Sequence, residues 1–261
     1  MTVLLLNASL LFHASFDRRL EADFSRGRSL PLEARGIEFR RGIKGEAVYV
    51  KPKGRLVYES EGNLNKARGS VEVWICPLFN GADQRWHPFF WEGVSWKDWE
   101  AKRNVIALWF WGEAGVARFD VRDPQDLYVV APARDWRAGE WHHLVATWDC
   151  QRGTRLFIDG REFLPRRKMA FSWEPIRHPS FFVGSSPFGH PGEVLVDELR
   201  IYDAPLSPEE VLERYYEFAP LTLSLSPCLL RPSPKAKLTV RIVNRSKRGV
   251  KAKAVVKVVS P

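Results

Sequence analysis

Aromatic side chains crowd one stretch of the chain, where they are mixed with charged and polar residues. Residues 85–99 read RWHPFFWEGVSWKDW, and six of the eleven Trp fall between Trp86 and Trp111. Indole rings can stack on the apolar C–H faces of sugars, while nearby polar side chains bind the sugar hydroxyls. We therefore expect this stretch to be a loop, joining two strands, that binds a carbohydrate. The residues expected to contact the ligand are Trp86, His87, Trp91, Trp96, Asp98 and Trp99.

A structural role is the alternative for the same aromatic residues. They would then close the open end of a hydrophobic core instead of facing a ligand. Trp109 and Trp111 follow on a predicted strand, where they share one face. We expect these two rings to belong to the core.

Other residue types that support catalysis occur without the spacing that catalysis needs. The chain has no G-x-S-x-G, H-E-x-x-H or phosphate-loop motif. His142 and His143 are adjacent on a predicted strand, so they face opposite sides and do not share a metal. The three cysteines, Cys76, Cys150 and Cys228, form neither a disulfide framework nor a C-x-x-C pair, and Cys76 is expected to be a small buried hydrophobe.

The elements that must position these residues are β-strands. Residues 142–149 are expected to form one strand and residues 155–158 a second, and Asp159-Gly160 is a strong signal for the hairpin turn that closes the second strand. Further short strands are expected at 70–77, 105–111 and 193–202, separated by Gly, Pro, Asn and Asp. The pattern is typical of an antiparallel β-sandwich. No run of eighteen apolar residues occurs, which argues against a membrane-spanning helix.

Several motifs, in order along the chain, resemble those of the laminin G-like, concanavalin A-type jelly-roll domains. The segments that carry the resemblance are 23–27 (DFSRG), 42–47 (GIKGEA), 69–77 (GSVEVWICP), 141–146 (WHHLVA), 156–160 (LFIDG) and 196–207 (VDELRIYDAPLS). The resemblance implies an all-β fold, an antiparallel jelly-roll β-sandwich. Lectins, binding modules and some glucanases share this fold, so the resemblance leaves the activity open.

The glucanases of this fold carry E-x-D-x-E or E-x-D-x-x-E on one strand, and the nearest match here is E-V-L-V-D-E at 193–198. On a regular strand Glu193 and Asp197 share a face but lie roughly 13 Å apart, and Glu198 faces the other side. Retaining and inverting glycosidases need carboxyl groups about 5–5.5 Å and about 6.5–9.5 Å apart. We therefore expect no catalysis of this kind.

The resemblance also implies a calcium ion. Such domains often hold Ca²⁺ where the loop after the first strand meets the last strand, and the matching carboxylates here are Asp17, Asp23 and Asp197. Hard oxygen ligands of this type are what Ca²⁺ requires. The alternative is that each Asp caps a turn.

A short helix is expected to end the first domain, which we place at residues 1–219. Ser207 is a suitable N-cap, Pro208 suits the first helical position, and Glu210 completes a capping box. Val211, Leu212 and Tyr215 would form its apolar stripe, and Pro220 ends it near Phe218.

The remaining segment, 220–261, is strongly basic. Residues 221–261 contain ten Lys or Arg and no Asp or Glu, which leaves 30 basic and 31 acidic residues in the rest of the chain. Strands are expected at 221–225, 235–243 and 251–258, and together they resemble the first half of an immunoglobulin- or fibronectin-like domain. A sheet this small needs a cover, which we expect from the large domain, a protein partner, another subunit in a homo-oligomer or a further C-terminal domain. No aromatic residue interleaves its basic residues, which argues against nucleic acid as the partner.

Two functions are consistent with these features. The first is a non-catalytic carbohydrate-binding or adhesion module that recognises a polysaccharide or glycan as part of a larger assembly. The second is a structural subunit of a virion, appendage or surface layer that docks through its basic segment, and a glycoside hydrolase ranks third. All three suggest an extracellular, cell-surface or virion location, although the apolar N-terminus lacks the basic region of a signal peptide.

Overall fold

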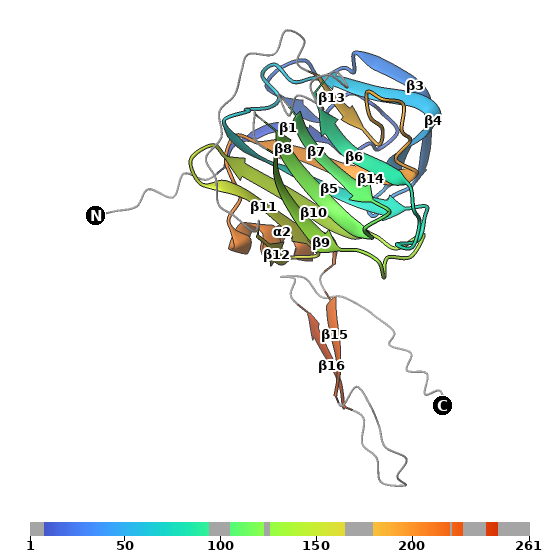
Figure 1. Ribbon diagram of the computed structural model, residues 1–261, viewed down its shortest axis with the longest axis vertical. Helices are drawn as coiled ribbons and strands as arrows, with labels where there is room; N and C mark the ends of the chain where they lie inside the picture. The colour runs from blue at the N-terminus through green and yellow to red at the C-terminus, as the bar shows by residue number, and fades with distance from the viewer. Residues whose placement is uncertain are drawn as a thin grey trace, which may run out of the picture. The chain divides into compact units, whose positions relative to one another are not determined.

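The structure is a computed structural model that describes residues 8–93, 105–122, 126–164, 180–219, 221–226 and 239–244. Two compact units divide the chain, residues 1–211 and 212–261. The first unit carries a single hydrogen-bonded network of fourteen strands (Figure 1). These strands are β1 (Leu10–Ala14), β2 (Phe24–Ser25), β3 (Glu33–Arg41), β4 (Glu46–Glu59), β5 (Arg68–Pro77), β6 (Trp86–Glu92), β7 (Val105–Trp111), β8 (Val116–Arg122), β9 (Asp126–Pro132), β10 (His142–Asp149), β11 (Gly153–Ile158), β12 (Arg161–Phe163), β13 (Ser180–Val183) and β14 (Val194–Tyr202).

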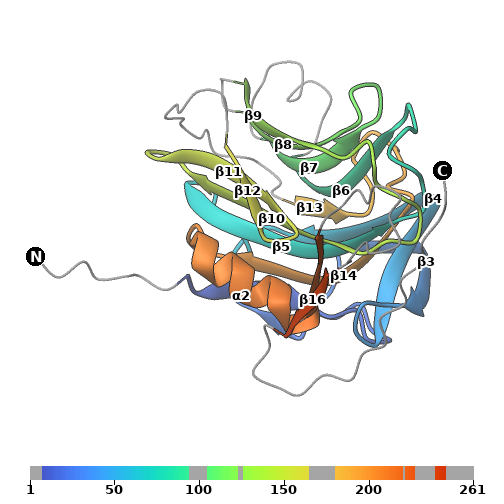
Figure 2. The same cartoon turned by 90° about the horizontal axis from the view of Figure 1, so that it is seen from below.

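The sheet folds over on itself through its longest strand, β4. The first half of β4 pairs with β14, through Val48 and Tyr49, and its second half pairs with β13, through Val57 and Tyr58. The strand order β12-β11-β10-β5-β14-β4-β13-β6-β7-β8-β9 therefore forms two layers, which Figure 2 shows face to face. Apolar residues from both layers fill the space between them and form the main hydrophobic core. The expected antiparallel β-sandwich is confirmed.

The predicted hairpin is present where the sequence places it. Strand β10 covers the eight residues His142–Asp149, and Ile158 pairs with Arg161 across the turn. Asp159 and Gly160 have φ values of 51° and 77°. Positive φ at both positions is what a type I′ turn requires.

Strand β14 contains a β-bulge that alters the expected alternation of its carboxylates. Its pairing with β5 shifts register between Asp197 and Arg200, and Glu198 has a φ of 47°. Val196 and Leu199 both face the core, so the two residues between them, Asp197 and Glu198, share the outer face. The expectation that Glu198 faces away from Asp197 is therefore wrong.

Helix α2 (Pro208–Phe218) begins and ends as predicted. Glu210 N donates to Ser207 Oγ at 3.2 Å, and Ser207 N donates to Glu210 Oε2 at 2.7 Å, which completes the capping box. Val211 is fully buried, but Leu212 is exposed, so the predicted apolar stripe is narrower than expected.

The second unit contains a two-stranded antiparallel sheet made of β15 (Leu221–Ser226) and β16 (Thr239–Asn244). The third strand predicted for this segment, 251–258, lies outside the described residues. Within the described part of the chain, no helix is long and apolar enough to cross a membrane.

A buried ion pair closes one end of β6. Glu92 is fully buried, and its carboxylate lies 2.9 Å from Lys66 Nζ. Burial raises the pKa of Glu92 to about 7, and the ammonium of Lys66 opposes that shift. The folded state therefore holds a proton at Glu92 over a pH range in which the unfolded chain has released it.

We predict that Glu92 makes the protein less stable as the pH rises from about 4.5 to about 7, because the folded pKa is raised above the unfolded one. Glu92→Gln has no proton to lose there. The stability of the wild type relative to this variant should thus fall by about 2–3 kcal/mol across the range. Urea unfolding at both pH values measures this change, and parallel pH profiles for the two proteins would contradict it.

Candidate functional site

The aromatic segment that opens at Trp86 is a strand in its first half and not the loop expected from its sequence. Strand β6 pairs with β7 and β13, and its register shifts between Pro88 and Phe90. This bulge explains why the segment lacks clean alternation. Phe89 and Phe90 both belong to the core, whereas Trp86, Pro88 and Trp91 face outward.

The next strand, β7, sends two more indole rings to the same outer face. Ile106, Leu108 and Phe110 belong to the main core, and the residues between them point the other way. Trp109 packs in a separate outer cluster with Trp91. Trp109 and Trp111 therefore share a face, as expected. Trp109 is buried, as expected of a core residue, but its cluster lies on the outer face of the sheet, apart from the main core.

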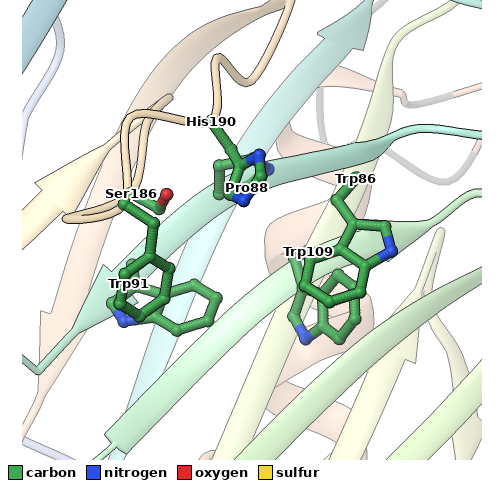
Figure 3. A pocket seen from close by; sticks show the side chains of 7 residues that line it. Trp86, Pro88, Trp91, Trp109, Ser186 and His190 are labelled. Atoms are coloured by element: carbon green, nitrogen blue, oxygen red, sulfur yellow. The ribbon is translucent and has the colours of Figure 1, made fainter. Parts of the chain in front are cut away.

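A pocket opens on this outer face, with an empty volume of about 220 Å³. In Figure 3 the rings of Trp86 and Trp109 lie on one side of it and Trp91 and Ser186 on the other, with Pro88 and His190 between them. The residues that line it are Trp86, Pro88, Trp91, Trp109, Ser186, Phe188 and His190. Strands β6 and β7 supply its floor, and the segment between β13 and β14 supplies one wall.

Rings meet at several angles around the pocket. The centroids of Trp86 and Trp109 are 5.2 Å apart at an interplanar angle of 57°, and His190 lies 5.7 Å from Trp86. Trp91 and Phe188 pack edge to face at 5.2 Å. Trp91 and Trp109 are buried, whereas Trp86 and Phe188 are half-buried and His190 is exposed. The floor is thus fixed by packing, and the rim presents aromatic surface to solvent.

One polar group in the pocket is buried without a partner. Ser186 is 1% exposed, and its Oγ makes no hydrogen bond. A buried hydroxyl left unpaired costs free energy, which a ligand hydroxyl or carbonyl would recover by pairing with it. The pocket therefore combines stacking surfaces with a hydrogen-bonding group.

Beyond Trp109, the outer face continues across β8 and β9 as an ordered polar and aromatic row. Trp109 Nε1 donates to Asp120 Oδ2 at 2.6 Å, and Arg118 donates to both oxygens of Asp120 at 2.6–3.0 Å. The Arg118 guanidinium lies 4.2 Å from the ring centroid of Tyr128 and 5.3 Å from that of Trp111. Tyr128 is 41% exposed. These contacts hold the rings in fixed orientations.

His87 lies on the opposite side of β6 from the pocket. Its ring stacks on Phe79, with centroids 3.7 Å apart, and it is almost fully buried. Its ring nitrogens lie 3.4 Å from Asp83 Oδ1 and 3.6 Å from Glu193 Oε2. Burial lowers the pKa of His87, and the two carboxylates oppose that shift. The structure therefore separates His87 from Trp86 and Trp91.

The structure brings only some of the predicted ligand-binding residues together. Trp86 and Trp91 meet in the pocket, and His87 faces away from it. Trp96, Asp98 and Trp99 lie outside the described residues. Sequence reasoning missed Ser186, Phe188 and His190, although an aromatic residue and a histidine within the Gly- and Pro-rich stretch 184–192 were a usable signal.

Each of the three predicted calcium ligands accepts a hydrogen bond from a backbone amide, and two of them do so at the turn formed by residues 42–46. Asp197 Oδ2 accepts from Ile43 N at 2.9 Å and from Lys44 N at 3.2 Å, and Asp17 Oδ1 accepts from Glu46 N at 2.8 Å. Asp23 accepts from Ser15 N at 2.7 Å and pairs with Arg19.

Asp17, Asp23 and Asp197 do not meet as one cluster. Among the described residues, the one group of three acidic, His or Cys side chains with ligand atoms within 4.8 Å of one another is Asp83, His87 and Glu193. Burial raises the pKa of Asp197 to about 7 against its backbone hydrogen bonds. Calcium binding stays a prediction, and EDTA should lower the unfolding temperature if it is correct.

The chain belongs to the concanavalin A-like lectin/glucanase superfamily, whose family profile (Laminin_G_3) matches residues 53–212. No curated protein matches its sequence. The fold is similar to that of domain 4 of an extracellular arabinanase from Geobacillus stearothermophilus, solved in complex with arabinotriose. That match has a TM-score of 0.52 and 19% sequence identity, and it covers 79% of this chain and 98% of the other.

Two larger proteins contain similar domains. The receptor-binding domain of botulinum neurotoxin C/D mosaic serotype matches with a TM-score of 0.63 and 10% identity, over 80% of this chain and 51% of its own. Trypanosoma rangeli sialidase matches with a TM-score of 0.55 and 12% identity, over 79% of this chain and 32% of its own. The chain thus spans about half of the neurotoxin domain and a third of the sialidase.

We predict that the turn at 42–45 requires glycine because Asp17 closes over it. A Cβ on Gly45 would lie 1.9 Å from Asp17 Oδ1, and the φ of Gly45 is +59°. An alanine side chain would displace Asp17 and break its hydrogen bond from Glu46 N. Gly45→Ala should therefore destabilise the fold by more than the roughly 1 kcal/mol that positive φ alone costs. Urea unfolding measures the difference.

Gly139→Ala is the matched control, because Gly139 also has positive φ but a Cβ added there would meet no atom within 4 Å. Gly45→Ala should lower the free energy of unfolding more than Gly139→Ala does, and this difference should shrink when both are made in an Asp17→Ala background. Equal costs for the two glycine variants would show that the Asp17 contact contributes nothing.

Proposed function

We propose that this chain is a non-catalytic carbohydrate-binding module that holds a glycan on the outer face of strands β6–β9. One sugar ring would occupy the pocket between Trp86, Trp91 and Trp109. The buried hydroxyl of Ser186 would bind a sugar hydroxyl there, and His190 would offer a further hydrogen bond at the rim.

The observation that carries this proposal is the pairing of indole rings with an unsatisfied hydroxyl in one pocket. A purely structural cluster has no use for a buried polar group without a partner, since that group lowers stability. A sugar presents apolar C–H faces and hydroxyls together, so it complements both features. The pocket is shallow and partly open to solvent. A single ring laid against its indoles is therefore the fitting occupant.

The rest of a longer glycan would run across the strands. Pro88, Trp109, Arg118 and Val130 are paired in register on β6, β7, β8 and β9. Neighbouring strands lie about 4.8 Å apart, so this row extends about 14 Å from the pocket toward Tyr128. That length accommodates more than one sugar ring and favours an oligosaccharide or polysaccharide segment over a free monosaccharide.

The non-catalytic part of the proposal rests on the state of Asp120. This carboxylate lies on the same outer face, but it is fully buried and both its oxygens accept hydrogen bonds from Arg118. Glycoside hydrolysis requires a pair of carboxyl groups that flank the scissile bond. A carboxylate fixed to an arginine and an indole serves better to orient rings than to transfer a proton.

We predict that Trp86→Ala weakens glycan binding at least tenfold, because it removes the stacking surface at the rim and leaves the buried floor intact. Ser186→Ala should weaken it severalfold through the lost hydrogen bond. The probes are soluble arabinan, xylan and β-1,3-glucan by affinity electrophoresis, and arabinotriose by calorimetry, since the similar arabinanase domain was solved with that sugar.

Trp141→Ala is the matched control, because Trp141 is a half-buried indole in a separate cluster with Cys76 and Leu195. Binding that is lost equally in Trp141→Ala, or no binding to any probe, would overturn the proposed site. Release of reducing sugar by the wild type would instead establish a hydrolase.

A further inference from the structure

We infer that Asp83, His87 and Glu193 form a binding site for a divalent transition metal of the zinc class. The three residues come from the loop after β5, from β6 and from the residue before β14. Their ligand atoms all lie within 4.8 Å of one another. One imidazole nitrogen and two carboxylate oxygens are a donor set that suits Zn²⁺ and leaves a position for water.

The state of His87 points to a missing ligand. The side chain is 1% exposed, and neither ring nitrogen makes a hydrogen bond, although carboxylates lie 3.4 and 3.6 Å away. Stacking on Phe79 fixes the ring plane beside the two carboxylates. A buried imidazole whose nitrogens make no hydrogen bond costs free energy, and a metal bound to one nitrogen recovers it.

Charge supports a divalent ion. Arg85 lies against both carboxylates, with Nη2 2.9 Å from Asp83 Oδ2 and 2.7 Å from Glu193 Oε2. With a neutral imidazole, the two carboxylates and this one guanidinium leave a net charge of −1. A divalent cation in place of the guanidinium brings the cluster to zero. The Arg85 side chain is 61% exposed, so it can leave toward solvent without disturbing the core.

The site adjoins the aromatic pocket along the chain. His87 stands between Trp86 and Pro88 on β6, and Glu193 ends the segment that carries Ser186 and His190. Leu78 N also donates to Glu193 O at 2.8 Å. A metal held by the three side chains therefore ties together the loop after β5, strand β6 and the pocket wall. Metal binding itself does not depend on the proposed sugar-binding function.

Calorimetric titration of the whole, EDTA-stripped protein with ZnSO₄ tests the site without any sugar. We expect one Zn²⁺ per chain and a rise in unfolding temperature on binding. Glu193→Gln should weaken this binding at least tenfold, and so should His87→Gln. Arg85→Ala should tighten it at least tenfold, because the competing cation is gone. Glu140→Gln is the control for a lost carboxylate, because Glu140 is exposed and is not one of the three cluster residues.

Spectroscopy provides a second readout if a variant folds poorly. Co²⁺ bound to the folded wild type should give visible absorption bands, and Glu193→Gln should remove or shift them. Two outcomes would overturn the inference. One is no Zn²⁺ binding by either the wild type or Arg85→Ala, which would leave Arg85 as the sole partner of the carboxylates. The other is binding that Glu193→Gln and His87→Gln both leave unchanged, which would place the ion elsewhere.

Discussion

The alternation of side chains along β6 and β7 is the constraint on which the whole candidate site depends. Each strand lies in a sheet that packs on the core through one face, so every second residue is committed to that core. Ile106, Leu108 and Phe110 fill the inward positions of β7. The indoles of Trp109 and Trp111 are therefore forced outward, and a shift of one residue would exchange core and site along the entire strand.

A bulge in β6 interrupts this alternation and places two pocket residues on the same face of the sheet. Trp86 and Trp91 are five residues apart, so a regular strand would place them on opposite faces. The extra residue between Pro88 and Phe90 restores them to one face. A second bulge, in β14, does the same for Asp197 and Glu198, which a regular strand would separate. The bulge in β6 thus brings two indole rings to one face of the sheet, and the bulge in β14 does the same for two carboxylates.

These bulges mark the limit of what the sequence could predict. The predictions of the Asp159-Gly160 turn and of the Ser207 capping box were correct, because each depends on interactions within four residues of sequence. The sequence indicated that Trp109 is buried but not on which side of the sheet, because aromatic residues suit the main core and an outer cluster equally well. Ser186 and His190 were not predicted as site residues, because they are about a hundred residues from Trp86 in the sequence and meet it only in the folded sheet. The superfamily and its sandwich, by contrast, followed from motifs spread along the sequence.

Backbone contacts join the pocket wall to its floor, in addition to the packing of Phe188 on Trp91. A Cβ on Gly192 would lie 2.5 Å from the carbonyl oxygen of Pro88, so only glycine lets these two segments of the backbone approach so closely. Gly184 N donates to Phe89 O at 2.9 Å, immediately beyond the same proline. The segment carrying Ser186 is thereby fixed to β6 at both its ends. These two contacts hold the segment against the floor of the pocket, and such preorganisation is what a binding site requires of its polar groups.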